Sequence, residues 1–184
     1  MTAVIAACGG DDDDAVAPSP DQPAAASENF GLVSSPGFAA GGVVTIGTQP
    51  PSSGLDPINM QDQGVYNICS QSLEYLVGVG ADGNIASNAL ATGWDVNATG
   101  DAWTFNLREG VTWQDGTAFT TADVAATMDR LSEAANAGLG GVMGVGAVEV
   151  VDDVTCVINL LNPNGNFPVL VSNFNAQTLI TPAL

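Results

Sequence analysis

Residues 103–124 read WTFNLREGVTWQDGTAFTTADV, and this stretch decides the fold. Trp103, Phe105 and Leu107 alternate with polar residues, which predicts a strand with one buried and one polar face. A Glu-Gly pair then breaks the strand, and the Asp-Gly pair at 115–116 predicts a turn. We therefore interpret the first half of the stretch as framework, with its tryptophans in the core.

The second half of the stretch predicts a helix. Thr120 and Asp123 resemble a capping box, in which the hydroxyl accepts from the Asp123 amide and the carboxylate reaches back to the start of the helix. Apolar residues follow at helical spacing: Val124, Ala125, Met128 and Leu131. This helix is predicted to run to about residue 135.

The remaining predicted elements are short and of both kinds. A helix is expected over about 62–76, with Asp62 as its N-cap and apolar residues at helical spacing. Extended pieces are expected at 42–47, on both sides of the Asp-Gly turn at 82–83, at 94–96, at 147–151 and at 154–161. Residues 136–146 are glycine-rich and predicted to be loose. The order of these elements predicts an α+β fold.

The charge of the chain excludes several classes of function. The chain has 2 Lys+Arg, 20 Asp+Glu and no histidine, which gives a net charge of −18. A basic surface for nucleic acid is therefore excluded, and so are a Ser-His-Asp triad and a histidine-ligated metal. High acidity is also found in proteins from saline surroundings, an interpretation that predicts a melting temperature rising with added NaCl.

The cysteines and acidic residues predict no metal site, catalytic group or cofactor. Cys69 and Cys156 belong to no CxxC pair, so they are expected to be two separately buried residues. Pairing in an oxidising compartment is the alternative. The acidic run 11–14 lacks the alternating ligands of a calcium loop and is interpreted as a solvated spacer.

The first 41 residues predict an anchor and a tether. VIAAC at 4–8 resembles a bacterial lipobox, in which Cys8 is lipidated. The apolar run is shorter than a signal peptide requires and carries no basic residue, so the true start is expected further upstream. Residues 9–41 are acidic and rich in Ala, Pro and Ser, which predicts a disordered tether.

Several segments together resemble the family 5 extracellular solute-binding proteins, the peptide, oligopeptide and nickel receptors of ABC importers. GGVVTIG resembles the opening strand of that family, and GLDPINMQDQGVYNICSQSLEYLV resembles its Leu-Asp-Pro loop and first helix. Residues 103–124 match its signature, with ALATGW before it and VEVVDDVTCVINLLNPN after it. The resemblance covers about residues 42–184.

The resemblance implies that three segments of the chain have different roles. Residues 1–8 would be a truncated lipoprotein signal, 9–41 the tether, and 42–184 the N-terminal part of the first lobe of a periplasmic-binding-protein type II-like fold. Family members are more than twice as long, so the chain is expected to be a truncated copy. The implied partners are a peptide or similar solute, the permease subunits of an importer, and the membrane through the lipid anchor.

The resemblance also implies where a ligand would lie and what the chain would do. The start of the first helix faces the cleft in this family, and the corresponding positions are Gln61, Asp62, Gln63, Gly64 and Tyr66. The structural alternative is that Asp62 caps the helix and the others are surface residues. The implied function is solute capture outside the cytoplasm by a non-enzymatic cell-envelope lipoprotein. The alternatives are a surface module without solute binding and an acidic hydrolase.

One of the two basic residues lies inside the signature. Arg108 is expected on the polar face at a strand end, close in sequence to three carboxylates, where a partly exposed ion pair contributes roughly 0–1 kcal/mol. We therefore interpret Arg108 as framework rather than as a ligand contact.

Overall fold

A computed structural model describes residues 43, 45–60, 62–134 and 139–183, all within the unit Gly31–Leu184. Cys8, Gln61 and the segments 1–8 and 9–41 lie outside the described residues. The helices are η1 (Pro57–Asn59), α1 (Gln63–Cys69), α2 (Thr121–Glu133), α3 (Phe167–Leu170) and η2 (Ala176–Thr178). The strands are β1 (Gly78–Val79), β2 (Ile85–Ala86), β3 (Ala91–Val96), β4 (Ala102–Leu107), β5 (Val148–Val150) and β6 (Thr155–Asn159). The α+β prediction is confirmed.

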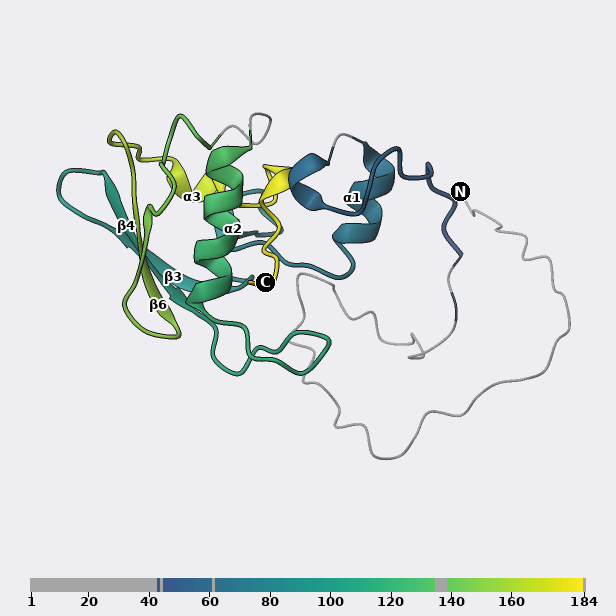
Figure 1. Cartoon of the computed structure of the whole chain (residues 1–184), viewed down its shortest axis with the longest axis horizontal. Helices are drawn as coiled ribbons and strands as arrows, with labels where there is room; N and C mark the ends of the chain where they lie inside the picture. Colours follow the sequence, from purple (N-terminus) through teal and green to yellow (C-terminus); the bar gives the residue numbers. More distant parts are fainter. Residues whose placement is uncertain (1–42, 44, 61, 135–138, 184) are drawn as a thin grey trace, which may run out of the picture. The chain divides into compact units, whose positions relative to one another are not determined.

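The centre of the fold is a four-stranded antiparallel sheet in the order β3-β4-β6-β5 (Figure 1). In β4, the burial alternates as the sequence predicts, with Trp103, Phe105 and Leu107 buried. Trp103 pairs with Val96 of β3 on one side and with Ile158 of β6 on the other. Strand β4 therefore joins the two halves of the sheet.

Helix α2 begins as the capping box predicts. The Thr120 hydroxyl accepts from the Ala122 amide at 3.3 Å, and the Thr120 amide donates to the Asp123 carboxylate at 2.8 Å. The predicted stripe is buried, since Val124, Met128 and Leu131 are at most 1% exposed. The helix ends two residues earlier than predicted.

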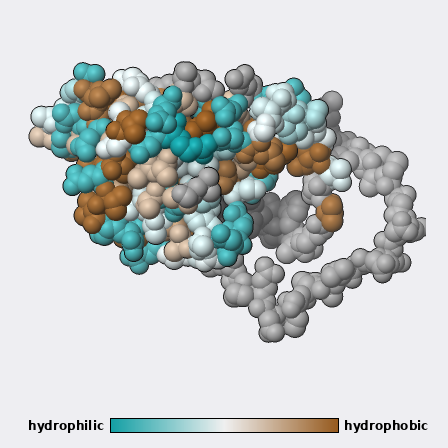
Figure 2. Space-filling view, in the orientation of Figure 1, coloured by the Kyte–Doolittle hydropathy of each residue, from teal (hydrophilic) through white to brown (hydrophobic). Residues whose placement is uncertain are grey.

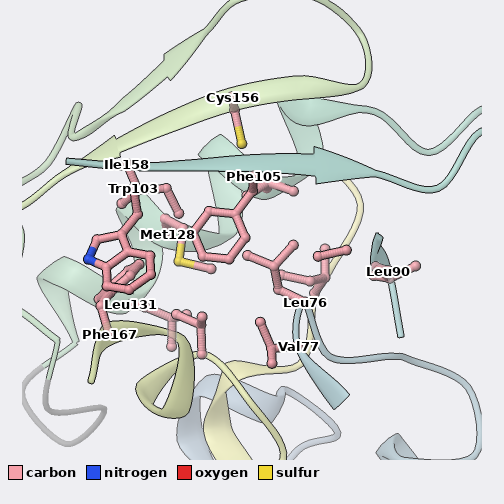
Figure 3. Close-up of a cluster of buried hydrophobic side chains, with 14 of the residues drawn as sticks. Leu76, Val77, Leu90, Trp103, Phe105, Met128, Leu131, Cys156, Ile158 and Phe167 are labelled. Carbon is pink, nitrogen blue, oxygen red and sulfur yellow. The ribbon is translucent and has the colours of Figure 1, made fainter. Parts of the chain in front are cut away.

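The main hydrophobic core lies between the sheet, α2 and the segments that follow α1 and β6. Phe105, Met128 and Leu131 gather there with Leu76 and Phe167 (Figure 3). The Trp103 indole N–H also reaches the Asn164 carbonyl at 3.1 Å. The core assignment of Trp103 is confirmed, whereas Trp113 is only half-buried at the core margin, with its ring 6.0 Å from that of Phe119.

The predicted hairpins and turns are present. Strands β1 and β2 pair antiparallel around the Asp-Gly turn, where Gly83 has a φ of 81°. Strands β5 and β6 pair around Asp152 and Asp153 as expected. The break at Glu109-Gly110 and the Asp-Gly turn at 115–116 are also seen, with Gly110 and Gly116 at positive φ. These local features depend on residues close together in sequence.

The predicted strand at 42–47 is wrong. Its described residues are irregular, and Val43 and Ile46 are 95% and 76% exposed. No strand of the described part of the chain pairs with this segment. A strand without a neighbour has no partners for its backbone hydrogen bonds, so the apolar run alone does not form one.

The predicted helix at 62–76 is too long, because α1 ends at Cys69. Residues after the helix are extended instead: Tyr75 forms a bridge with Leu179, and Val77 forms one with Ser172. Leu76 and Val77 are fully buried in the main core. Packing against the distant segment 172–179 therefore overrides the helical spacing.

The segment predicted to be loose also contributes to the core. Residues 139–146 contain no helix or strand. Leu139 and Met143 are nevertheless at most 1% exposed and pack in the main core. Glycine content alone therefore gave the wrong prediction for these two positions.

The two described cysteines are separate. Cys69 and Cys156 are both free and buried, each in its own hydrophobic cluster. Burial raises the pKa of the Cys156 thiol to about 12. The expectation of two separately buried residues is confirmed, and the alternative of a disulfide between them is wrong.

Arg108 makes a different contact from the one expected. Its Nε and Nη2 groups each donate to the Ala89 carbonyl at 3.4 Å, and it forms no ion pair with any described residue. The neighbouring carboxylates on turns are held by local hydrogen bonds instead: Asp101 accepts from Asn97 and Thr99, and Asp115 accepts from Thr117. Arg108 thus joins the end of β4 to the segment before β3, a structural role.

The surface of the folded part mixes both kinds of residue. Figure 2 shows hydrophobic residues distributed among hydrophilic ones on the face in view. The described residues include no helix long and apolar enough to cross a membrane. Within the same residues, no group of three or more His, Cys, Asp or Glu side chains is arranged to hold a metal ion.

Candidate functional site

The start of α1 is fixed by Asp62. Its Oδ1 accepts from the Val65 amide at 2.9 Å, which satisfies one of the free N–H groups at the helix start. Its Oδ2 accepts from the Ser52 amide at 3.1 Å and also from the Ser52 hydroxyl. One carboxylate therefore caps the helix and holds the loop that precedes it.

These hydrogen bonds keep Asp62 ionised. The Ser52 hydroxyl, followed by the Val65 amide, lowers the pKa of the Asp62 carboxyl below its ordinary value. Hydrogen bonding to a carboxylate favours its charged form. Asp62 therefore places a negative charge at the start of α1 at neutral pH.

Gly64 is required by a close approach of the backbone. It is buried, and a Cβ atom at this position would lie 2.4 Å from the Gln49 carbonyl oxygen and 2.9 Å from the Pro50 carbonyl carbon. Both are main-chain atoms, which cannot rotate away. The absence of a side chain lets the loop before η1 pack on the first turn of α1.

An open pocket of about 400 Å³ lies beside this helix start. Its lining residues come from two places, the start of α1 and the segment after α3: Met60, Asp62, Gln63, Tyr66, Asn173 and Ala176. Met60, Tyr66 and Ala176 also belong to the smaller hydrophobic cluster or pack against it. The pocket thus combines an apolar side with amide, hydroxyl and carboxylate groups.

The two walls of the pocket are tied together by Gln177. Its side-chain amide donates to the Ile58 carbonyl at 3.1 Å and to the Met60 carbonyl at 3.2 Å. The Tyr75 hydroxyl donates to the Ala176 carbonyl at 3.3 Å. These contacts hold the segment around η2 against η1 and against the residues that follow η1 and α1.

The polar groups of the pocket offer both acceptors and donors. The Gln63 amide nitrogen already donates to Asn67 at 2.7 Å, which leaves its carbonyl oxygen without a partner among the described residues. The Tyr66 hydroxyl and the Asn173 side chain likewise have no hydrogen bond within the described part of the chain. These three groups are available to a bound molecule.

The pocket brings together three of the predicted ligand-binding residues, Asp62, Gln63 and Tyr66. Gly64 lies behind them and does not line the pocket. Sequence reasoning missed Met60, Asn173 and Ala176. Met60 could have been found from its position beside the Leu-Asp-Pro loop, whereas nothing local distinguishes Asn173 from other asparagines.

A second, smaller pocket of about 80 Å³ is lined by residues from the segments 72–74 and 111–119 and by Leu90. Its lining includes Ser72, Glu74, Trp113 and Gln114, and the Gln114 side chain donates to the Ser72 carbonyl at 2.7 Å. The Trp113 indole N–H is buried and has no partner among the described residues. This pocket is too small to enclose a peptide and lies apart from the predicted site residues.

The chain is similar to bacterial solute-binding proteins. The family model described as "Bacterial extracellular solute-binding proteins, family 5 Middle" matches residues 86–181. The glutathione-binding protein GsiB of Escherichia coli K12 is 30% identical over 154 residues, which are 83% of this chain and 30% of that protein. The chain therefore spans about a third of the length of the curated relatives it matches.

Solved structures show the same fold. AgaA from A. tumefacien R10, solved with agropinic acid, is 26% identical with a TM-score of 0.61, and the match covers 73% of this chain and 27% of that one. The murein tripeptide binding protein MppA of Escherichia coli is 23% identical with a TM-score of 0.59, over 73% of this chain and 30% of that one. The mixed α/β fold thus matches part of periplasmic binding proteins.

Proposed function

Because this chain belongs to the bacterial extracellular solute-binding proteins of family 5, we propose that it captures peptides or similar small solutes for an ABC importer. The family consists of binding proteins, so the chain is not an enzyme and an acidic hydrolase is not retained. The observation that carries the proposal is the convergence of Asp62, Gln63 and Tyr66 with Asn173 on one open pocket.

The chemistry of this pocket suits a short peptide. Peptide groups present N–H donors and C=O acceptors along their length, and the free Gln63 carbonyl and Asn173 amide match them. The ring of Tyr66 and the side chain of Met60 supply the apolar contact that small-molecule sites use. The GsiB and MppA names, which refer to glutathione and a murein tripeptide, support a ligand of this class.

Each segment of the chain would have its own role in this function. Residues 42–184 would form the N-terminal part of the first lobe, and a second lobe would close over the pocket by a hinge motion. Cys8 would carry a lipid that anchors the protein outside the cytoplasm, with residues 9–41 as the tether. Permease subunits of the importer would be the protein partners.

Calorimetric titration of the chain with tri-alanine tests the proposal. Binding is expected, and the Tyr66→Phe and Asn173→Ala variants should each weaken it by a factor of about 5–10, the equivalent of one lost hydrogen bond. Asn106→Ala is the matched control, because Asn106 is exposed on β4 and does not line the pocket. Absence of heat with this and other short peptides would favour the alternative of a surface module without solute binding.

Anchoring is tested separately. Expression of the gene in a bacterial host with Cys8→Ser should move the protein from the membrane fraction to the soluble extracytoplasmic fraction. Ser19→Ala in the tether is the control. Membrane association that survives the loss of Cys8 would contradict the lipid anchor.

A further inference from the structure

We propose that the pocket at α1 receives a neutral or cationic part of the solute and excludes carboxylates, an inference that rests on the proposed function. The only two basic residues, Arg108 and Arg130, both lie away from this pocket. Arg130 is paired with Asp56 at 2.6 Å, and Arg108 donates to the Ala89 carbonyl. Neither lines the pocket.

The wall of the pocket carries a negative charge. Asp62 is the one charged residue among those that line it, and its hydrogen bonds hold it in the ionised form. A solute carboxylate in the pocket would lie near this charge with no cation among the described lining residues to compensate it. An ammonium group in the same place would gain an attraction instead, because two charges in a partly buried site interact more strongly than in water.

The donors and acceptors of the pocket act in the same direction. The free oxygen of Gln63 accepts hydrogen bonds, and one of the two N–H groups of that side chain is occupied by Asn67. Donors for a carboxylate come from Tyr66, Asn173 and the second N–H group of Gln63, and none of them is charged. Ammonium and amide N–H groups carry donors, so they fit this wall better than carboxylates, which carry only acceptors.

The net charge of −18 acts in the same direction at longer range. A strongly acidic protein attracts cations and repels anions over distances of about a Debye length. This general effect disappears with added salt, whereas a preference set by the pocket itself is screened much less. The two contributions are therefore separable by experiment.

Three tri-alanine peptides test the inference by calorimetry at about 0.15 M NaCl. One has a free amine and an amidated end, one is blocked at both ends, and one is acetylated with a free carboxylate. We expect the cationic and neutral peptides to bind at least about ten times more tightly than the anionic peptide. Tightest binding of the anionic peptide would overturn the inference and leave the proposed function standing. If none of the three peptides binds, the proposed function fails and the inference fails with it.

Two matched variants locate the origin of the preference. Asp62→Asn removes the charge and keeps a good N-cap residue, so α1 is expected to remain folded. Asp82→Asn removes one charge from the exposed turn between β1 and β2, outside the pocket lining. We expect Asp62→Asn to reduce the preference for the cationic peptide at least threefold and Asp82→Asn to leave it unchanged. An equal reduction in both variants would overturn the role of the pocket.

Discussion

Arg130 lies with its Nη2 2.6 Å from a carboxylate oxygen of Asp56, and this ion pair joins α2 to the residue that precedes η1. The two side chains are 43% and 38% exposed, so solvent screens the pair. We expect a double-mutant cycle of Arg130→Gln and Asp56→Asn to give a coupling of at most about 1 kcal/mol in urea unfolding. Asn at 56 retains an oxygen for the Ile58 amide. A coupling that persists unchanged in about 1 M NaCl, where the Debye length is about 3 Å, would contradict this view.

Gly64 should tolerate no larger residue. Gly64→Ala places a Cβ atom against the main chain of Gln49 and Pro50, and overpacking of this kind typically costs about 1–3 kcal/mol. Gly54→Ala is the control, because nothing lies within 4 Å of a Cβ atom at that position. The free energies of unfolding of both variants, measured in urea, check this. Equal stability of the two variants would show that the loop before η1 moves aside without cost.

Ser52 should control the titration of Asp62. Ser52→Ala removes the largest contribution to the lowered pKa of Asp62, so the pKa should rise toward its ordinary value. The control is Ser53→Ala, because the Ser53 hydroxyl donates only to the Gly54 carbonyl. Carboxyl-carbon NMR titration measures both pKa values. An unchanged pKa in Ser52→Ala would show that the main-chain amides, those of Val65 and Ser52 above all, set the value.

The same hydrogen bonds make stability depend on pH in the acid range. Four aspartates have a lowered pKa in the folded state because of hydrogen bonds to nearby side chains and amides: Asp62, Asp82, Asp101 and Asp115. The unfolded chain binds more protons in this range, so their contribution is present above a pH of about 4 and is lost as the pH falls through the folded values.

The two core-facing tryptophans should respond differently to the loss of the indole N–H. Trp103→Phe removes a hydrogen bond to the Asn164 carbonyl, whereas the Trp113 N–H has no partner among the described residues. Both changes remove a similar ring volume. We expect Trp103→Phe to be more destabilising by about 0.5–1.5 kcal/mol, the net value of one hydrogen bond. Urea unfolding measures the difference, and a larger loss in Trp113→Phe would indicate that an ordered water satisfies this N–H.

Much of the fold could be predicted from the sequence where the determining residues are neighbours. The alternation of Trp103, Phe105 and Leu107 and the capping box of Thr120 and Asp123 both operate within a few residues, and both are confirmed. The Asp-Gly turns are local in the same sense. Periodicity and cap chemistry are sufficient for such elements because no distant partner decides them.

The structural predictions that were wrong concern segments whose conformation depends on contacts with residues far away in the sequence. The apolar run at 42–47 has the composition of a strand, but composition does not say whether a neighbouring strand is available. Leu76 and Val77 continue the spacing of α1, yet segment 172–179 holds them extended. The pocket shows the same limit, since Asp62 and Tyr66 could be predicted from the helix start, whereas the opposite wall at Asn173 and Ala176 carries no local signal.

The strand order also constrains how the chain folds. Val96 and Trp103 pair across seven positions of sequence, and Val150 and Cys156 pair across six, whereas Trp103 and Ile158 pair across 55. Loop-closure entropy rises by about 0.6 kcal/mol with each doubling of length, so joining β4 to β6 costs about 2 kcal/mol more than closing either hairpin. We therefore expect the hairpins β3–β4 and β5–β6 to form first and the pairing of β4 with β6 to form later.

If the strands pair in this order, the rate of unfolding depends mainly on the contacts between β4 and β6. Ile158 is fully buried there, and Ile158→Val should speed unfolding more than it slows folding, because contacts that form after the folding barrier act mainly on the unfolding rate. Stopped-flow kinetics in urea measure both rates, and a change confined to the folding rate would contradict this order. The lifetime of the folded state in this chain thus depends on the pairing of β4 with β6 in the middle of its sheet.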